Sequence, residues 1–290
     1  MARFQRTIAR SARLEGVGVH AGAPAVIEFR PAAPGAGVAF RRADRREGQG
    51  PIAAHVSAVA DARLGTTLRA ADGAEAATVE HVLAAVFGLG LDNLEIVLEG
   101  PEAPIMDGSA LPYAQALLAA GLVDQGAPAH GLEITAPIWV EEAGRRAALL
   151  PDPDANGLTL DVAIAFADPA IGEQRLQMAV TPESFLAGIA PARTFGFLKE
   201  LEPLRASGRA MGSSFENTIV IDEGRVLNKE GLRFPDECVR HKALDVIGDL
   251  ALLGLPILGR CEAVRPGHAL TVALMKAVLD NPACWRTKQI

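Results

Sequence analysis

The sequence predicts an α+β fold, a duplicated two-domain sandwich in which each domain is a β-sheet packed on two helices, with the candidate site at the domain seam. Strand-like and helix-like segments alternate in both halves of the 290-residue chain, as in mixed α and β architectures. A helix containing His81 can be overlaid on a later helix containing His241, and Gly88 then falls on Gly248. The stretch 126–131 has the glycine and proline content of a linker. We therefore expect domains at 1–127 and 128–290.

Composition and charge exclude several classes of protein. Apolar residues make up 49% of the chain and charged residues 22%, which is typical of a globular protein. The formal net charge of −7 and the low aromatic content argue against nucleic-acid binding. The three cysteines form no disulfide framework, which favours a reducing compartment. The longest apolar stretch is interrupted by Asp249 and is too short to span a bilayer. We expect a cytoplasmic monomer whose membrane contact is at most peripheral.

The first half contains four predicted strands and two predicted helices. Apolar residues at helical spacing predict a helix over Thr78–Leu89 with Thr78 as its N-cap, and a second helix covers Ala110–Ala120. His20 falls in a glycine-rich loop between the first two strands and is expected to be a solvated loop residue. The predicted strands are Thr7–Leu14, Ala25–Arg30, Val38–Arg41 and Leu94–Leu98.

The second half repeats this pattern. A long helix is expected to start near Pro235 and Asp236, both helix-start residues, and to end at Leu250. A last helix is expected over His268–Asp280. The predicted strands are Leu132–Val140, Ala147–Leu150, Leu158–Ala165 and Ile257–Val264, with a further short element at Pro182–Ala187.

A polar stripe runs along the long helix beside its apolar face. His241, Asp245 and Asp249 are spaced four residues apart, so their side chains lie one above another. A His and an Asp one turn apart can reach a single cation. If this helix meets the one that begins with Glu80 and His81, the ligands His81, His241 and Asp245 leave a fourth position for water, which is the arrangement of a catalytic metal site.

Three neighbouring side chains complete the predicted chemistry. Glu80 points elsewhere than its neighbour His81, so it can take a proton from a water whose pKa a metal lowers toward ~7. His268 is a candidate acid, which Asp249 can orient and keep charged. Cys238 precedes His241 by three residues, and thiolate is a good zinc ligand, so the pair Cys238 and His241 is an alternative.

A series of short motifs, taken in order, resembles UDP-3-O-acyl-N-acetylglucosamine deacetylase, the zinc amidase family of lipid A synthesis in Gram-negative bacteria. Each motif alone is weak, but the ordered set is specific and runs from Thr7 to near Leu279. The motifs lie at Thr78–His81, Pro104–Ala110, Arg193–Phe197, Val226–Asn228, Gly231–Phe234, Val239–Leu250 and Gly267–Leu270.

The resemblance implies a function, a cofactor and roles for individual residues. It implies hydrolytic removal of acetate from UDP-3-O-(3-hydroxyacyl)-N-acetylglucosamine, the committed step of lipid A biosynthesis. It implies Zn²⁺ held by His81, His241 and Asp245, although two His and a carboxylate also suit Fe²⁺. The remaining roles are Glu80 as general base, His268 as cationic acid or oxyanion partner with Asp249 behind it, Thr194 as an oxyanion donor, Lys242 as a sugar or diphosphate contact, Phe195 and Phe197 as substrate-packing rings, and residues 197–221 as the insert that forms an acyl-chain passage.

Two positions depart from the family pattern. Pro266 and Thr271 stand where a small polar residue and Asn are more usual, which leaves open how the loop before His268 meets substrate. Two other functions also remain open: a metal-dependent amidase for a different sugar amide, and a metal-stabilised binding module without turnover. The apolar residues of the insert discriminate the first of these, because an acyl passage should make binding depend on chain length.

Overall fold

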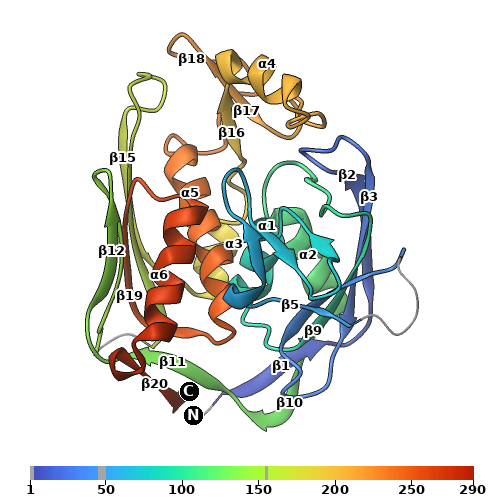
Figure 1. Cartoon of the computed structure of the whole chain (residues 1–290), viewed down its shortest axis with the longest axis vertical. Coiled ribbons are helices and arrows are strands. Elements are labelled where there is room, and N and C mark those ends of the chain that lie inside the picture. Colours follow the sequence, from blue (N-terminus) through green and yellow to red (C-terminus); the bar gives the residue numbers. More distant parts are fainter. Residues whose placement is uncertain (1–2, 45–49, 154–155) are drawn as a thin grey trace.

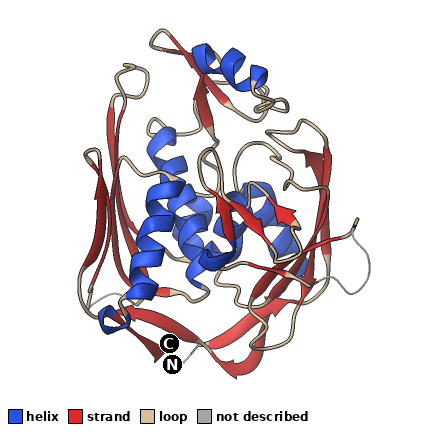
Figure 2. Ribbon diagram, in the orientation of Figure 1, coloured by secondary structure: helices blue, strands red, loops and turns tan. Residues whose placement is uncertain are grey.

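The computed structural model describes residues 3–44, 50–153 and 156–290, and its fold is α+β as predicted. Two main sheets enclose a layer of helices between them (Figures 1 and 2). The sheet of the first half has the strand order β2 (Ala12–Val17), β3 (Pro24–Pro31), β9 (Leu94–Glu99), β4 (Val38–Arg42) and β5 (Ile52–Ala53).

The sheet of the second half is larger and mixed. Its central strand β19 pairs antiparallel with β13 and parallel with β11 and β14. The order is β12 (Ile138–Glu142), β13 (Arg145–Leu150), β19 (Ile257–Val264), β11 (His130–Ile134) and β20 (Trp285–Gln289), while β14 (Leu158–Ala165) joins β19 and carries β15 (Glu173–Ala179).

The strands place apolar side chains on the face of each sheet that the helices cover. In β3, Ile27 and Phe29 are buried and the residues between them are not, as expected for a sheet with one covered face. In β14, Leu160, Val162 and Ile164 are buried at alternate positions, and Asp161 between them is also buried, where it pairs with Arg175 and Arg260. The helices that cover the sheets and the shorter helices around them are α1 (Glu80–Gly88), α2 (Leu111–Ala120), α3 (Pro182–Gly188), α4 (Leu198–Ala206), α5 (Glu237–Leu250) and α6 (His268–Asp280).

Three smaller sheets complete the described structure. One contains β16 and β17 in parallel with α4 between them in sequence, and it extends from the rest of the molecule at the top of Figure 1. The residues 197–221 for which the sequence predicted an insert lie within this unit, and "insert" refers to them below. The small sheets are β1 (Phe4–Ile8) with β10 (Leu122–Pro128); β6 (Val59–Asp61) with β7 (Thr67–Arg69) and β8 (Glu75–Ala76); and β16 (Phe195–Phe197) with β17 (Ile219–Asp222) and β18 (Arg225–Val226).

Two predicted strands are each broken in two, so their predicted extents were wrong. The segment Thr7–Leu14 changes partner: β1 pairs with β10, whereas β2 pairs with β3. The segment Leu132–Val140 breaks where Thr135 and Ala136 donate their backbone N–H groups to the carbonyl of Cys284. Both breaks are made by partners distant in sequence, and hydrophobic periodicity does not register such partners.

The stretch 126–131 is not a loop, because β10 extends to Pro128 and β11 begins at His130. Its glycine and proline are accommodated at the ends of these strands. The placement of the domain boundary near residue 128 stays a prediction. In the described ranges no helix combines the length and the apolar character needed to cross a membrane.

Candidate active site

Three predicted ligands meet where α1 crosses α5. Nε2 of His241 lies 3.3 Å from Oδ1 of Asp245, and Nε2 of His81 lies 3.6 Å from the same oxygen. All three side chains are buried, and one ligand atom from each lies within 4.8 Å of the others. Among the residues that the structure describes, this is the one group of His, Cys, Asp and Glu close enough to share a metal ion.

The donor set fits a divalent transition metal. Nδ1 of His241 lies 3.0 Å from the carbonyl oxygen of Ala192, and a proton held on Nδ1 leaves Nε2 free to coordinate. Burial lowers the pKa of His241 despite the nearby Asp245, so the imidazole is neutral, as a ligand must be. Nδ1 of His81 is buried and has no hydrogen-bond partner in the described structure. Two imidazoles and a carboxylate suit Zn²⁺ or Fe²⁺.

A glycine permits the close approach of the two helices. A Cβ built on Gly248 would lie 1.9 Å from the backbone oxygen of Glu80 and 2.7 Å from its carbonyl carbon. Only glycine fits at such a contact. The first turn of α1, with Glu80 and His81, therefore rests directly on the turn of α5 that follows Asp245.

Glu80 and Asp249 are joined through Thr66, a residue that the sequence did not indicate. The backbone N–H of Thr66 donates to Oε2 of Glu80 at 2.9 Å, and its hydroxyl donates to Oδ1 of Asp249 at 2.7 Å. All three residues are buried. Thr66 lies in a loop 183 positions from Asp249, and no local pattern marks such a threonine.

His268 begins α6 and pairs with Asp249, as predicted from the sequence. Its Nδ1 lies 2.9 Å from Oδ2 of Asp249. Burial by itself favours the neutral ring, but the charges of Asp249, Glu80 and Asp245 outweigh it and raise the pKa of His268 to about 10. The ring is therefore a cation at neutral pH in this arrangement.

The loop before His268 is held by the β12–β13 hairpin. Arg265 has a φ of 49° and contacts the backbone oxygen of Gly144, while Nε of Arg145 donates to the carbonyl of Arg265 at 3.1 Å. Thr271 is buried, and its hydroxyl donates to the carbonyl of Gly267 at 3.3 Å. The departure at Thr271 thus lies inside the first turn of α6, where it bonds to backbone.

The residues implied by the resemblance lie on the side of α5 toward the insert. Thr194 donates its backbone N–H to the carbonyl of Gly108 at 2.8 Å and lines the site cavity. Nζ of Lys242 lies 2.8 Å from Oδ2 of Asp245 and 5.6 Å from the ring centre of Phe195. Phe195 and Phe197 both contact the ring of Phe166, at centroid distances of 5.6 and 5.8 Å.

One cavity of about 560 Å³ brings these residues together. Every predicted site residue except Asp249 lines it, and Asp249 lies behind His268. Leu201 and Leu204 of α4 form an apolar wall in the insert. His20 also lines the cavity and is half-buried, with its Nδ1 atom buried, so this loop residue is less solvated than expected. The glycine-rich loop therefore borders the site through Val19 and His20.

Two other expectations were tested by the local geometry. Thr78 is not an N-cap: α1 follows Val79, and no side chain caps its first turn. Thr78 has a φ of 55° and donates its hydroxyl to Glu102 instead. Cys238 is buried outside the cluster of ligands, and burial raises the pKa of its thiol to about 12, which disfavours the thiolate that binds metal.

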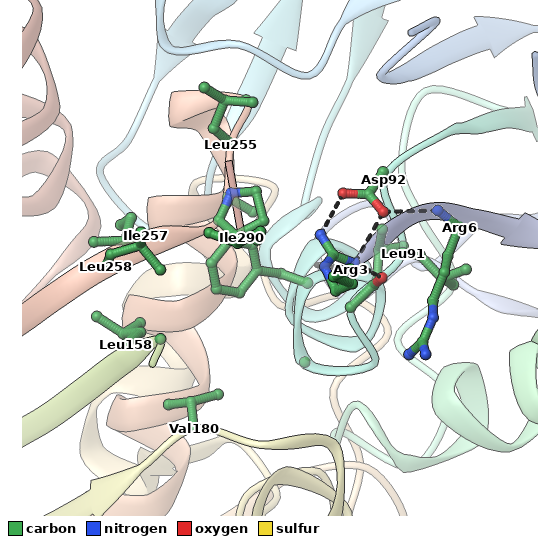
Figure 3. A pocket seen from close by; sticks show the side chains of 18 of the residues that line it. Arg3, Arg6, Leu91, Asp92, Leu158, Val180, Leu255, Ile257, Leu258 and Ile290 are labelled. Atoms are coloured by element: carbon green, nitrogen blue, oxygen red, sulfur yellow. Dashed lines mark hydrogen bonds and ion pairs between the residues drawn. The ribbon is translucent and has the colours of Figure 1, made fainter. Parts of the chain in front are cut away.

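A second cavity of about 680 Å³ lies at the opposite ends of the helices (Figure 3). Its walls are mostly apolar and include Leu158, Leu255 and Ile257. Arg3, which is labelled in Figure 3, forms two hydrogen bonds of 2.7 and 3.0 Å to Asp92, so its charge is already paired. None of the predicted site residues lines this cavity. The smaller cavity is therefore the candidate active site.

Comparisons with known proteins show the family to which this chain belongs. The family model for LpxC, UDP-3-O-acyl N-acetylglycosamine deacetylase, matches residues 5–280. A protein of Phenylobacterium zucineum named UDP-3-O-acyl-N-acetylglucosamine deacetylase is 46% identical over 98% of this chain and 96% of its own length. Proteins with the same name from Myxococcus xanthus and Haemophilus influenzae are 44% and 42% identical, each over 97% of this chain and over 88% and 92% of their own lengths. The chain belongs to the UDP-3-O-acyl N-acetylglycosamine deacetylase family.

Proposed function

We propose that this protein hydrolyses the acetamide of UDP-3-O-(3-hydroxyacyl)-N-acetylglucosamine, releasing acetate in the committed step of lipid A biosynthesis. The observation that carries the proposal is one cavity lined both by the His81, His241 and Asp245 cluster and by apolar residues of α4. A nucleotide sugar with an acyl chain needs both kinds of lining. The names of the relatives support this substrate.

His81, His241 and Asp245 would hold the metal, for which we propose Zn²⁺, with Fe²⁺ as the alternative. When bound, it supplies Lewis-acid polarisation of the amide carbonyl and acidifies water. Glu80, fixed by the N–H of Thr66, takes a proton from the attacking water. The new C–O bond forms as that proton reaches Glu80, and the carbonyl carbon becomes tetrahedral.

His268 serves the second half of the reaction. As a cation it stabilises the negative charge that develops on the carbonyl oxygen or donates its proton to the leaving nitrogen as the C–N bond breaks. Asp249 keeps the ring charged and oriented. Where His268 only stabilises the oxyanion, the proton held by Glu80 passes to the leaving nitrogen; where His268 donates a proton to that nitrogen, Glu80 releases its own proton to solvent. In both cases the products are acetate and the free amine of the sugar.

The other predicted residues hold the substrate. We propose that the hydroxyl of Thr194 contributes to the oxyanion site and that Lys242 contacts the sugar or diphosphate. Phe195 and Phe197 line the cavity between the cluster and α4, so their rings can pack on the substrate. Residues 197–221 would form the passage for the acyl chain, which takes up apolar surface that α4 leaves uncovered by protein.

Acetate release from the acylated UDP-sugar tests the proposal. Release is expected from the metal-loaded protein, should stop on chelation, and should return with added Zn²⁺ or Fe²⁺. Glu80→Gln should retain metal but lose ~10²–10⁴ in kcat, the range for a positioned general base. The exposed Glu99→Gln, in the same half, is the matched control. No release from folded, metal-loaded protein contradicts the proposal.

Chain-length dependence separates this substrate from other sugar amides. Each CH₂ removed from the acyl chain should weaken binding by ~0.8 kcal/mol while the removed group is buried. A protein indifferent to chain length would act on a different sugar amide. We further propose that the protein works as a cytoplasmic monomer, which light scattering of the purified protein and fractionation of cells would check.

A further inference from the structure

Glu102 is a buried carboxylate with no part in the proposed chemistry. Its side chain is 4% exposed and lies in the segment between β9 and α2. Burial of a carboxylate is costly unless hydrogen bonds compensate for the lost water. The groups that satisfy it therefore show what this residue holds in place.

Three donors converge on Glu102 from two segments. Its Oε1 accepts the backbone N–H of His20 at 2.8 Å and the hydroxyl of Thr78 at 3.0 Å, and its Oε2 accepts the backbone N–H of Ala21 at 2.9 Å. Consecutive backbone N–H groups that point at one carboxylate form an anion-binding concavity. A Cβ on Gly18 would lie 2.2 Å from Oε2, so the loop approaches this closely because residue 18 is glycine.

The hydrogen bond from Thr78 connects Glu102 to the start of α1. Thr78 has a φ of 55°, a conformation that is costly for a β-branched residue and persists only where the surroundings enforce it. It is followed by Val79 and then by Glu80 and His81, the proposed base and the first proposed ligand. The hydrogen bond from Thr78 to Glu102 thus fixes the turn that sets the direction of α1.

The two backbone hydrogen bonds from His20 and Ala21 connect Glu102 to a loop that contacts the insert. The carbonyl of His20 accepts the N–H of Met211 at 3.1 Å, and that of Val19 accepts the N–H of Gly212 at 3.0 Å. His20 itself lines the cavity. The loop held by Glu102 therefore contacts the insert at Met211 and Gly212.

We propose that Glu102 is a positioning residue: it holds the turn at Thr78 and the loop at residues 18–22 so that Glu80, His81 and the insert face one cavity. Its kinetic consequence rests on the proposed deacetylation, whereas its effect on the geometry of the ligands does not. A carboxylate suits the place because it only accepts hydrogen bonds. A Gln side chain has the same size but would turn an NH₂ group toward one of the three donors.

Glu102→Gln tests the proposal, with the exposed Glu99→Gln as the matched control. We expect kcat/KM for acetate release to fall at least ~10-fold and up to ~10²-fold, the scale of a misplacement near 1 Å, chiefly through kcat. At saturating metal, the metal content and the folded fraction should match the wild type. The proposal is overturned if kcat/KM stays within about twofold of the wild type, or if the loss only follows lost metal or unfolding.

Thr78→Val provides a second, milder variant that leaves Glu102 in place. It removes one hydrogen bond and keeps the side-chain volume, so it remains informative if Glu102→Gln does not fold. We expect a smaller fall in kcat than for Glu102→Gln. In the double variant the two effects should not multiply, because both remove the same contact. Effects that multiply in the double variant, or wild-type kcat in Thr78→Val, would contradict the proposal that Glu102 holds the turn at Thr78.

Visible absorption of the Co²⁺-loaded protein separates this inference from the proposed function. If the wild type releases no acetate, the proposed function fails, but the positions of the ligands can still be read from the Co²⁺ spectrum. Glu102→Gln should shift the band position or intensity because His81 moves, while Glu99→Gln should leave the spectrum unchanged. An unaltered spectrum in Glu102→Gln would overturn the positioning of His81.

Discussion

Replacement of Gly248 by alanine should damage both the stability and the metal centre of this protein. The added Cβ would lie 1.9 Å from the backbone oxygen of Glu80, whereas real Cβ atoms stay at least 3.0 Å from such atoms. The neighbouring atom belongs to the backbone, so no side chain can rotate away. The helices α1 and α5 must therefore separate by ~1 Å at their crossing.

The magnitude follows from this displacement. Overpacking of a core contact costs ~1–3 kcal/mol, which corresponds to a fall in Tm of ~2–12 °C for a protein of this size class. The same shift moves Glu80 and His81 away from His241 and Asp245. A displacement of ~1 Å at a catalytic site costs ~10² in rate, and metal affinity should fall with it.

Thermal melting, metal competition with a chelator and acetate release measure the three effects. Gly188→Ala is the control, because a Cβ there meets only the guanidinium end of Arg240, at 3.0 Å. That guanidinium belongs to a side chain, which can shift as the backbone of Glu80 cannot, so Gly188→Ala should lower the Tm much less than Gly248→Ala. A Gly248→Ala protein that melts at or above the wild-type temperature and keeps its metal would refute the reasoning.

Three further predictions concern the pairs around the site. Asp249→Asn should lower the pKa of His268 and move the basic limb of the kcat profile to lower pH; an unchanged limb would show that another group is the acid. In protein from which a chelator has removed the metal, the His268–Asp249 pair contributes its full stabilisation of the folded state below about pH 6.5. This contribution is lost as pH rises through about 10, the pKa of His268. The Tm difference between wild type and Asp249→Asn should therefore shrink over that range. Asp245→Ala should lower metal content and Cys238→Ala should not, as elemental analysis would show; the reverse would make Cys238 the ligand.

Local pattern in the sequence was enough to predict the helices of the site. The apolar spacing of 237–250 and of 268–280 predicted α5 and α6 nearly to the residue, because a helix places residues three and four apart on one face. The same spacing placed His241, Asp245 and Asp249 on one side of α5. The order of the motifs then indicated the family, which the comparisons confirmed.

Tertiary contacts decided what lies around those residues. The strand breaks near residues 9–11 and 135–137, the role of Thr78 and the position of His20 all depend on partners far along the chain. Thr66 and Glu102 carry no local signal, since one is a loop threonine and the other an acidic residue before a turn. Periodicity records only which face of an element is buried, whereas a hydrogen bond between residues separated by 183 positions exists only after the two halves have packed.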